Sequence, residues 1–264
     1  MDYEDLLLEK KDCIATITLN NPDRLNAFTE KMTRSFFSAV DEIAQDDEVR
    51  VVILTGAGRG FCSGIDVSTL GEGSPGATGA SQFKALQVRE GNKNIALPKL
   101  NKPVIAAING ACVGGGLSLA LSCDIRVASE TAQFGVTQVG LGRIPDNAIT
   151  FFLPYTIGLS KALEIMFIAE PISAAEAERA GIVSRVVAPD QLMKETRELA
   201  AKIASKGPIS AGLTKRIVWR DLFESIARHQ ELEGQARQIA MNTEDAKEGL
   251  QAFREKRPPQ FKGR

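Results

Sequence analysis

The chain has 264 residues, with 32 Lys and Arg against 33 Asp and Glu, one His and four Cys. The formal net charge is −1, so the chain lacks the excess of basic residues that is typical of nucleic-acid-binding proteins. We therefore expect no nucleic-acid partner. We find no signal peptide and no apolar run of about 18 residues, so we expect a cytoplasmic protein without a membrane span.

The N-terminal part of the chain predicts alternating strands and helices. Two β-rich runs at 6–10 and 13–19 predict a hairpin, and Thr29 is placed to cap a helix that runs to about residue 45. An apolar run at 49–54 then predicts a buried strand. The order of these elements indicates a strand–strand–helix rhythm.

A polar, glycine-rich stretch at 71–79 follows. It is either a tolerated surface insertion or a lid over a substrate. A helix is expected over 81–96, and Pro98 and Pro103 are expected to end it before the next strand.

The stretch at 103–124 organises the chain, because a buried strand and a buried helix are predicted on either side of three glycines at 114–116. Glycines let a ligand approach the backbone, and the free N–H groups of a helix start favour negative charge. Tight helix packing would explain the glycines equally well. A second glycine-rich stretch at 55–66 also follows a strand. Together the two strand ends predict a pair of N–H donors that form an oxyanion hole.

Beyond this helix we expect strands at 125–128 and 132–135, then a glycine-punctuated loop at 139–147 that enters an apolar helix. Asp146 lies near the start of that helix. From its position alone, this carboxylate is most simply a helix cap.

The C-terminal part is charged and mostly helical. We expect a last strand at 182–187 and helices at 189–206, 208–228 and 229–255. These helices have too little apolar surface for a core of their own. We therefore divide the chain into a core at 1–190 and a helical region at 191–264 that packs on the core and on neighbouring subunits of a homo-oligomer.

No metal site is predicted. The four cysteines lack a C-x-x-C spacing and are expected to be mostly buried free thiols. The single histidine, His229, is expected to be structural or solvated, because no nucleophile motif accompanies it.

Six motifs, taken in order along nearly the whole chain, resemble the crotonase (enoyl-CoA hydratase/isomerase) superfamily. They are Asn-Pro-Asp-Arg-Leu-Asn-Ala at 21–27, Gly-Phe-Cys-Ser-Gly-Ile-Asp at 60–66, Asn109-Gly110 with Val-Gly-Gly-Gly at 113–116, Cys123-Asp124, Phe134-Gly135, and the stretch 249–261. The resemblance implies an α/β crotonase fold of repeated ββα units in a spiral core. It also implies a helical C-terminal region that mediates trimerisation, often as a dimer of trimers.

The resemblance further implies an acyl-CoA thioester substrate and no cofactor other than the coenzyme A that the substrate carries. Its thioester oxygen would be held by the backbone N–H groups of Ile65 and Gly115. The CoA nucleotide would lie near the loop that contains Arg24 and Leu25, and Lys256 would reach its phosphates, although Arg24 and Lys256 are also typical of a solvated surface. The full set expected at the substrate and CoA site is Arg24, Leu25, Cys62, Gly64, Asp66, Gly114, Ser118, Gln138 and Lys256.

The chain departs from the typical hydratase pattern at both glutamates that would flank a water molecule. Ser118 and Gln138 stand at those positions, and neither can exchange a proton as a carboxylate does. Asp146, in the run Arg-Ile-Pro-Asp, matches the position of a catalytic acid in isomerases of the family. The sequence motifs are most similar to those of ring-epoxide phenylacetyl-CoA isomerases. With this context we expect Asp146 to be catalytic rather than a cap.

The expected activity is therefore that of an enoyl-CoA isomerase, in which Asp146 moves a proton while an enolate waits in the oxyanion hole. The alternative is an enoyl-CoA hydratase. A hydrolase or dehalogenase with Asp146 as nucleophile and a non-catalytic acyl-CoA-binding protein are further alternatives. The sequence does not identify the acyl group.

Overall fold

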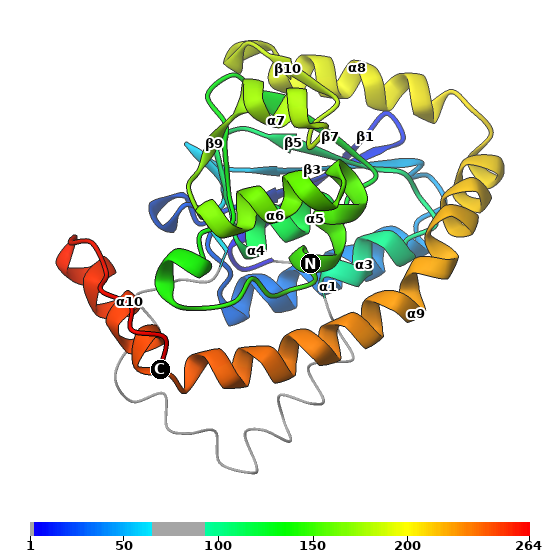
Figure 1. The fold of residues 1–264 in the computed structure, drawn as a ribbon. Helices are drawn as coiled ribbons and strands as arrows, with labels where there is room; N and C mark the ends of the chain where they lie inside the picture. The colour runs from blue at the N-terminus through cyan, green and yellow to red at the C-terminus, as the bar shows by residue number, and fades with distance from the viewer. Residues whose placement is uncertain (1–2, 65–92) are drawn as a thin grey trace.

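Two sheets carry the strands of successive ββα turns in the computed structural model, which describes residues 3–64 and 93–264 (Figure 1). The larger sheet has the order β1 (Leu6–Lys11), β2 (Ile14–Leu19), β3 (Val51–Gly56), β5 (Val104–Ile108), β7 (Ile125–Ser129) and β10 (Arg185–Val187). The smaller sheet has the order β4 (Gly60–Cys62), β6 (Ala111–Val113), β8 (Gln133–Gly135) and β9 (Ile172–Ser173).

The spiral follows from how consecutive strands are shared between the sheets. β3, β5 and β7 lie side by side and parallel in the larger sheet. The strand that follows each of them, β4, β6 or β8, lies in the smaller sheet, where these three strands are also parallel. Each turn of the chain thus adds one strand to each sheet, and the strand–strand–helix rhythm expected from the sequence is confirmed.

Helices and short 3-10 turns surround the sheets among the described residues. The helices are α1 (Glu30–Gln45), α3 (Lys93–Lys99), α4 (Gly115–Leu121), α5 (Ile149–Ile157), α6 (Leu159–Ile168), α7 (Ala174–Ala180), α8 (Leu192–Ala204), α9 (Pro208–Met241) and α10 (Glu244–Glu255). The 3-10 turns are η1 (Pro22–Arg24), η3 (Val139–Leu141) and η4 (Pro189–Gln191). No helix of the described part is long and apolar enough to cross a membrane.

Local chemistry explains several element boundaries. The N-terminal hairpin forms as expected, with Leu6 opposite Leu19 and Lys11 opposite Ile14. Thr29 caps α1, because its hydroxyl accepts the N–H of Met32 at 3.0 Å. The stretch at 71–79, which the sequence leaves open as a surface insertion or a lid, lies outside the described residues.

Three sequence-based boundaries need correction. α9 is continuous from Pro208 to Met241, so the expected break at 228/229 is wrong. Nothing at Arg228 or His229 stops a helix, whereas Thr243 starts α10 by accepting the N–H of Ala246 at 3.0 Å. The last strand is shorter than expected and covers only β10. Pro98 lies inside the last turn of α3 instead of beyond the helix end.

The larger sheet is covered on both faces, as its continuous apolar strands require. One face packs into the main core with α1 and α4, and the other packs under α8 through Val51, Ile53, Leu192 and Ala200. α8 therefore completes the body of the molecule. The expected division of the chain at residue 190 stays a prediction.

A buried ion pair attaches α9 to the body. The Nζ of Lys215 lies 2.8 Å from Oδ2 of Asp124 and donates to the carbonyls of Leu97 and Lys102 at 2.7 and 2.9 Å. The Nε1 of Trp219 donates to the other oxygen of Asp124 at 2.8 Å. From this anchor α9 passes α3 and α5 and leads to α10 on the other side of the molecule (Figure 1).

Candidate active site

The ends of two neighbouring spiral turns meet at the N-terminus of α4. Gly64 has a φ of +86°, and a Cβ there would lie 2.9 Å from both the N of Gly115 and the carbonyl oxygen of Val113. A Cβ on Gly116 would lie 2.0 Å from the carbonyl oxygen of Cys62. Only glycine permits these approaches. The glycines therefore serve close packing, and that packing also brings the end of the 60–64 segment to the backbone of Gly115.

The predicted partner donor, Ile65, and the predicted CoA contact Asp66 lie outside the described residues. Because Gly64 directly precedes Ile65, its position against Gly115 is the described contact closest to the expected oxyanion hole. The assignment of Ile65 and Gly115 as donors stays a prediction.

Gln138 faces Gly114. Gly114, the N-cap residue of α4, has a φ of +52°, and a Cβ there would lie 3.3 Å from Nε2 of Gln138. The Oε1 of Gln138 is buried and has no hydrogen-bond partner among residues 3–64 and 93–264. A buried amide oxygen of this kind calls for a bound water or ligand group.

Ser118 connects α4 to the segment that carries Asp146. It is fully buried, and its hydroxyl donates to the main-chain carbonyl of Asn147. The Nδ2 of Asn147 donates to Oδ1 of Asp146 at 2.7 Å and lies 3.8 Å from the position of a Cβ on Gly115. Asp146 is thus held beside the N-terminus of α4.

Asp146 does not cap the helix that follows it. α5 begins at Ile149 after the N-cap residue Ala148, which forms no side-chain cap. The Asp146 side chain is instead 21% exposed, with Oδ2 3.6 Å from a guanidinium nitrogen of Arg237 on α9. A partly exposed carboxylate in this position can exchange a proton with a bound molecule.

The sequence analysis missed Asn147, Glu233 and Arg237. Asn147 and Ala148 adopt consecutive left-handed conformations, with φ of +62° and +63°, and only the tolerance of asparagine for this region gave a signal in the sequence. Glu233 and Arg237 resemble ordinary solvated charges of a polar helix. Their neighbours are decided by where α9 packs.

Glu233 is 6% exposed and lies on the same face of α9 as His229 and Arg237. Burial raises its pKa, although hydrogen bonds from Thr150 and Ala148 oppose that shift. His229 Nε2 lies 2.7 Å from the same Thr150 hydroxyl, so the expectation that this histidine is structural fits its position.

The loop expected to contact CoA lies beside the 62–64 segment. Ser63 donates its N–H to the carbonyl of Leu25 at 3.0 Å and its hydroxyl to the carbonyl of Arg24 at 3.2 Å. The Arg24 side chain is exposed, whereas that of Cys62 is completely buried. Cys62 can therefore face a ligand only through its main chain.

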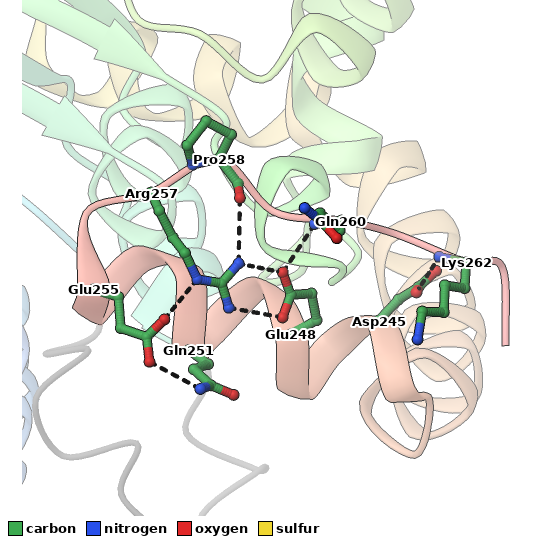
Figure 2. Close-up of polar contacts among 8 residues, drawn as sticks. All are labelled: Asp245, Glu248, Gln251, Glu255, Arg257, Pro258, Gln260 and Lys262. Carbon is green, nitrogen blue, oxygen red and sulfur yellow. Dashed lines mark hydrogen bonds and ion pairs between the residues drawn. The ribbon is translucent and has the colours of Figure 1, made fainter.

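Lys256 is exposed at the C-cap of α10, with a φ of +53°. α10 packs closely on η3, because a Cβ on Gly249 would lie 2.4 Å from the main chain of Leu141. The chain beyond Lys256 folds back along α10. Figure 2 shows Arg257 binding both carboxylate oxygens of Glu248, at 2.5 and 2.9 Å. This places Lys256 at a sharp reversal of the chain, but no described contact joins it to Asp146 or Gln138.

Comparisons with known proteins agree on one family. A family model described as enoyl-CoA hydratase/isomerase matches residues 9–264. A short-chain-enoyl-CoA hydratase of Clostridium acetobutylicum is 38% identical over 264 residues, covering 97% of each chain. An (E)-benzylidenesuccinyl-CoA hydratase of Thauera aromatica is 39% identical over 261 residues, covering 97% of this chain and 98% of that one. The crystal structure of a carnitinyl-CoA hydratase from Mycobacterium avium has a TM-score of 0.85 at 29% identity and covers all of both chains.

Proposed function

The chain belongs to the enoyl-CoA hydratase/isomerase family, and on this premise we propose that it adds water to the conjugated double bond of an enoyl-CoA thioester, with Asp146 as general acid–base. The sequence analysis favoured isomerisation and kept hydration as the alternative. The relatives described above are named hydratases, and this favours the alternative. The single observation that carries the proposal is the position of the Asp146 carboxylate, held by Asn147 beside the N-terminus of α4.

The thioester oxygen binds between the N–H groups of Ile65 and Gly115 in this proposal. Addition of hydroxide to the far end of the double bond places negative charge on that oxygen. A donor aimed at such a charge typically contributes about 2.7–4 kcal/mol to transition-state stabilisation. The support is the approach of Gly64 to Gly115 and the helix start at Gly115.

Asp146 takes a proton from water, and the same carboxylic acid then protonates the enolate carbon. Gln138 Oε1 is a buried acceptor that can hold the second hydrogen of that water. The Ser118 hydroxyl does not donate to the water in this proposal, because it donates to the Asn147 carbonyl. One carboxylate and one amide thus replace the two glutamates of the typical hydratase pattern.

Isomerisation is the second candidate, and a specific observation favours it. With Ser118 and Gln138 at the two glutamate positions, the described site offers Asp146 as its partly exposed carboxylate. A single carboxylate can remove a proton from one carbon and return it to another while the enolate stays bound. This route needs no bound water.

The CoA part of the substrate is proposed to lie along Arg24, Leu25 and the main chain of 62–64. The support is the pair of hydrogen bonds from Ser63 to this loop. Asp66, Gly114 and Lys256 complete the proposed contacts. The reaction needs no cofactor beyond the coenzyme A of the substrate.

A homo-oligomer, a trimer or a dimer of trimers, is also proposed. α9 exposes Ile209, Leu213 and Ile217 at 77%, 52% and 72%. Their spacing of four places them on one face of the helix, and a second copy of the chain can cover that face.

The test is incubation of straight-chain, cyclic and aryl enoyl-CoA thioesters in heavy water, followed by mass spectrometry. A product that gains the mass of water establishes hydration. A shifted double bond or deuterium uptake without added water establishes isomerisation. We expect Asp146→Asn to reduce turnover about 10²- to 10⁴-fold, and the exposed Asp190→Asn to leave it unchanged. Intact thioester binding without any turnover would refute both enzymatic proposals.

A further inference from the structure

Glu233 is buried although it lies on a largely polar helix. Its Oε2 accepts the N–H of Ala148 at 2.8 Å, and its Oε1 accepts the hydroxyl of Thr150. Ala148 ends the segment that joins Asp146 to α5, and Thr150 lies in the first turn of α5. Burial of a carboxylate costs free energy unless hydrogen bonds compensate it, so these two bonds stabilise an otherwise unfavourable position.

The segment needs such support. Asn147 and Ala148 both have a positive φ, a conformation that asparagine tolerates but that is unfavourable for alanine. Ala148 occupies the N-cap position of α5 and has no side chain that could cap the helix. In an ordinary capping box a glutamate of the same helix accepts the N–H of the N-cap residue. Here Glu233 of α9 accepts it.

A second contact holds the same two residues from the opposite helix. The hydroxyl of Ser118 on α4 binds the carbonyl of Asn147, and Glu233 on α9 binds the next N–H along the chain. The Asn147 amide donates to the Asp146 carboxylate. The orientation of Asp146 therefore depends on the conformation of a backbone that both helices hold.

We propose that Glu233 is a positioning residue for Asp146, because it holds Ala148 and Asn147 in the left-handed conformation that turns the Asp146 carboxylate toward the N-terminus of α4. This inference rests on the proposed function, in which Asp146 moves a proton. The inference gives α9 a role in the reaction through Glu233, a residue that does not touch the substrate.

Glu233→Gln tests the inference with little change in shape. Both partners donate to the carboxylate, and the amide nitrogen of glutamine cannot accept either bond, so at least one of the two present hydrogen bonds is lost. Glu233→Asp keeps two acceptor oxygens on a shorter side chain. Glu231→Gln is the matched control, because Glu231 is exposed on the same helix.

We expect Glu233→Gln to lower kcat about 10- to 100-fold, because the Asp146 carboxylate is misoriented. KM should change little, because substrate binding is not affected. Glu233→Asp should recover part of kcat, and Glu231→Gln should match the wild type. In an Asp146→Asn background, Glu233→Gln should cause no further loss. Hydrogen exchange in the peptide 144–152 should accelerate in Glu233→Gln and not in Glu231→Gln.

An unchanged kcat in Glu233→Gln would overturn the inference, as would a further loss in the Asp146→Asn background. Exchange that accelerates equally along the whole of α9 would also overturn it, because Glu233 would then only attach the helix. Hydrogen exchange does not depend on turnover. If the wild type converts no thioester, the proposed function fails. Faster exchange confined to 144–152 in Glu233→Gln would still show that Glu233 holds Asn147 and Ala148. Unchanged exchange in that peptide would refute this hold.

Discussion

The hydroxyl of Ser118 donates a hydrogen bond to the main-chain carbonyl of Asn147 and so ties α4 to the segment that carries Asp146. The family resemblance places a glutamate at the position of Ser118. In this chain the Ser118 side chain, which cannot exchange a proton at neutral pH, holds the loop of Asp146, the proposed general acid–base. The position to which the resemblance gives a catalytic glutamate is thus occupied here by a residue that contacts the loop of Asp146.

Ser118→Ala should lower the free energy of unfolding by about 1–3 kcal/mol, because a buried carbonyl loses its donor. It should also lower kcat by more than this loss of stability explains, since Asn147 positions Asp146. Ser122→Ala is the matched control: Ser122 is equally buried on the end of the same helix, but its hydroxyl donates to Leu119 within that helix, at 2.7 Å. Urea denaturation and steady-state kinetics measure both effects. Equal losses of kcat in the two variants would contradict the assigned contact.

Gly64→Ala should both destabilise the protein and abolish turnover. Gly64 and Gly181 share a φ of +86°, so alanine at either position adds backbone strain of about 1–3 kcal/mol. At Gly181 nothing lies within 4 Å of the added Cβ, whereas at Gly64 it would lie 2.9 Å from the N of Gly115. The difference between the two variants therefore isolates the clash at the proposed oxyanion hole. Equal stability and activity in Gly64→Ala and Gly181→Ala would show that this close approach is unimportant.

Lys215→Met should lower the free energy of unfolding by about 3–5 kcal/mol, because it leaves the carboxylate of Asp124 without its buried partner. Lys161→Met removes an ion pair of nearly the same length, 2.7 Å against 2.8 Å. The Lys161 side chain is 48% exposed and that of Lys215 only 5%, so the loss at Lys161 should be about 0–1 kcal/mol. Chemical denaturation of both variants compares them directly. A loss at Lys215 as small as that at Lys161 would refute its role in anchoring α9.

The C-terminal tail should loosen in acid. Hydrogen bonds from Arg257 lower the pKa of Glu248 from 4.5 to about 2, so the folded state favours the ionised carboxylate. The resulting stabilisation is complete above pH 4.5 and is lost as the pH falls toward about 2. Hydrogen exchange of residues 257–264, corrected for its intrinsic dependence on pH, should accelerate over this range.

Glu248→Gln should loosen the tail at every pH and remove this dependence. Glu244→Gln is the control, because Glu244 pairs with Arg264 while both side chains remain more than half exposed. A tail that exchanges at the same corrected rate at neutral pH and near pH 2 would contradict the prediction.

Local sequence patterns predicted the elements whose causes lie within a few residues. The hairpin at β1 and β2 and the Thr29 cap both form, because each depends on neighbouring groups along the chain. The end of α9 was misplaced because Arg228 and His229 neither continue nor stop a helix by themselves. The break between α9 and α10 instead lies where Thr243 caps α10.

Short-range periodicity in the sequence indicated the strand–strand–helix rhythm. The ordered motifs indicated the family, and this resemblance implied the spiral core and the candidate carboxylate Asp146. Only the tertiary structure decided what surrounds Asp146. Glu233 reaches Ala148 across 85 positions of sequence, and Arg237 reaches Asp146 from the same helix. No local window distinguishes these two side chains from the solvated charges around them. The physical reason is that burial and pairing of a charge depend on which distant surface its helix packs against.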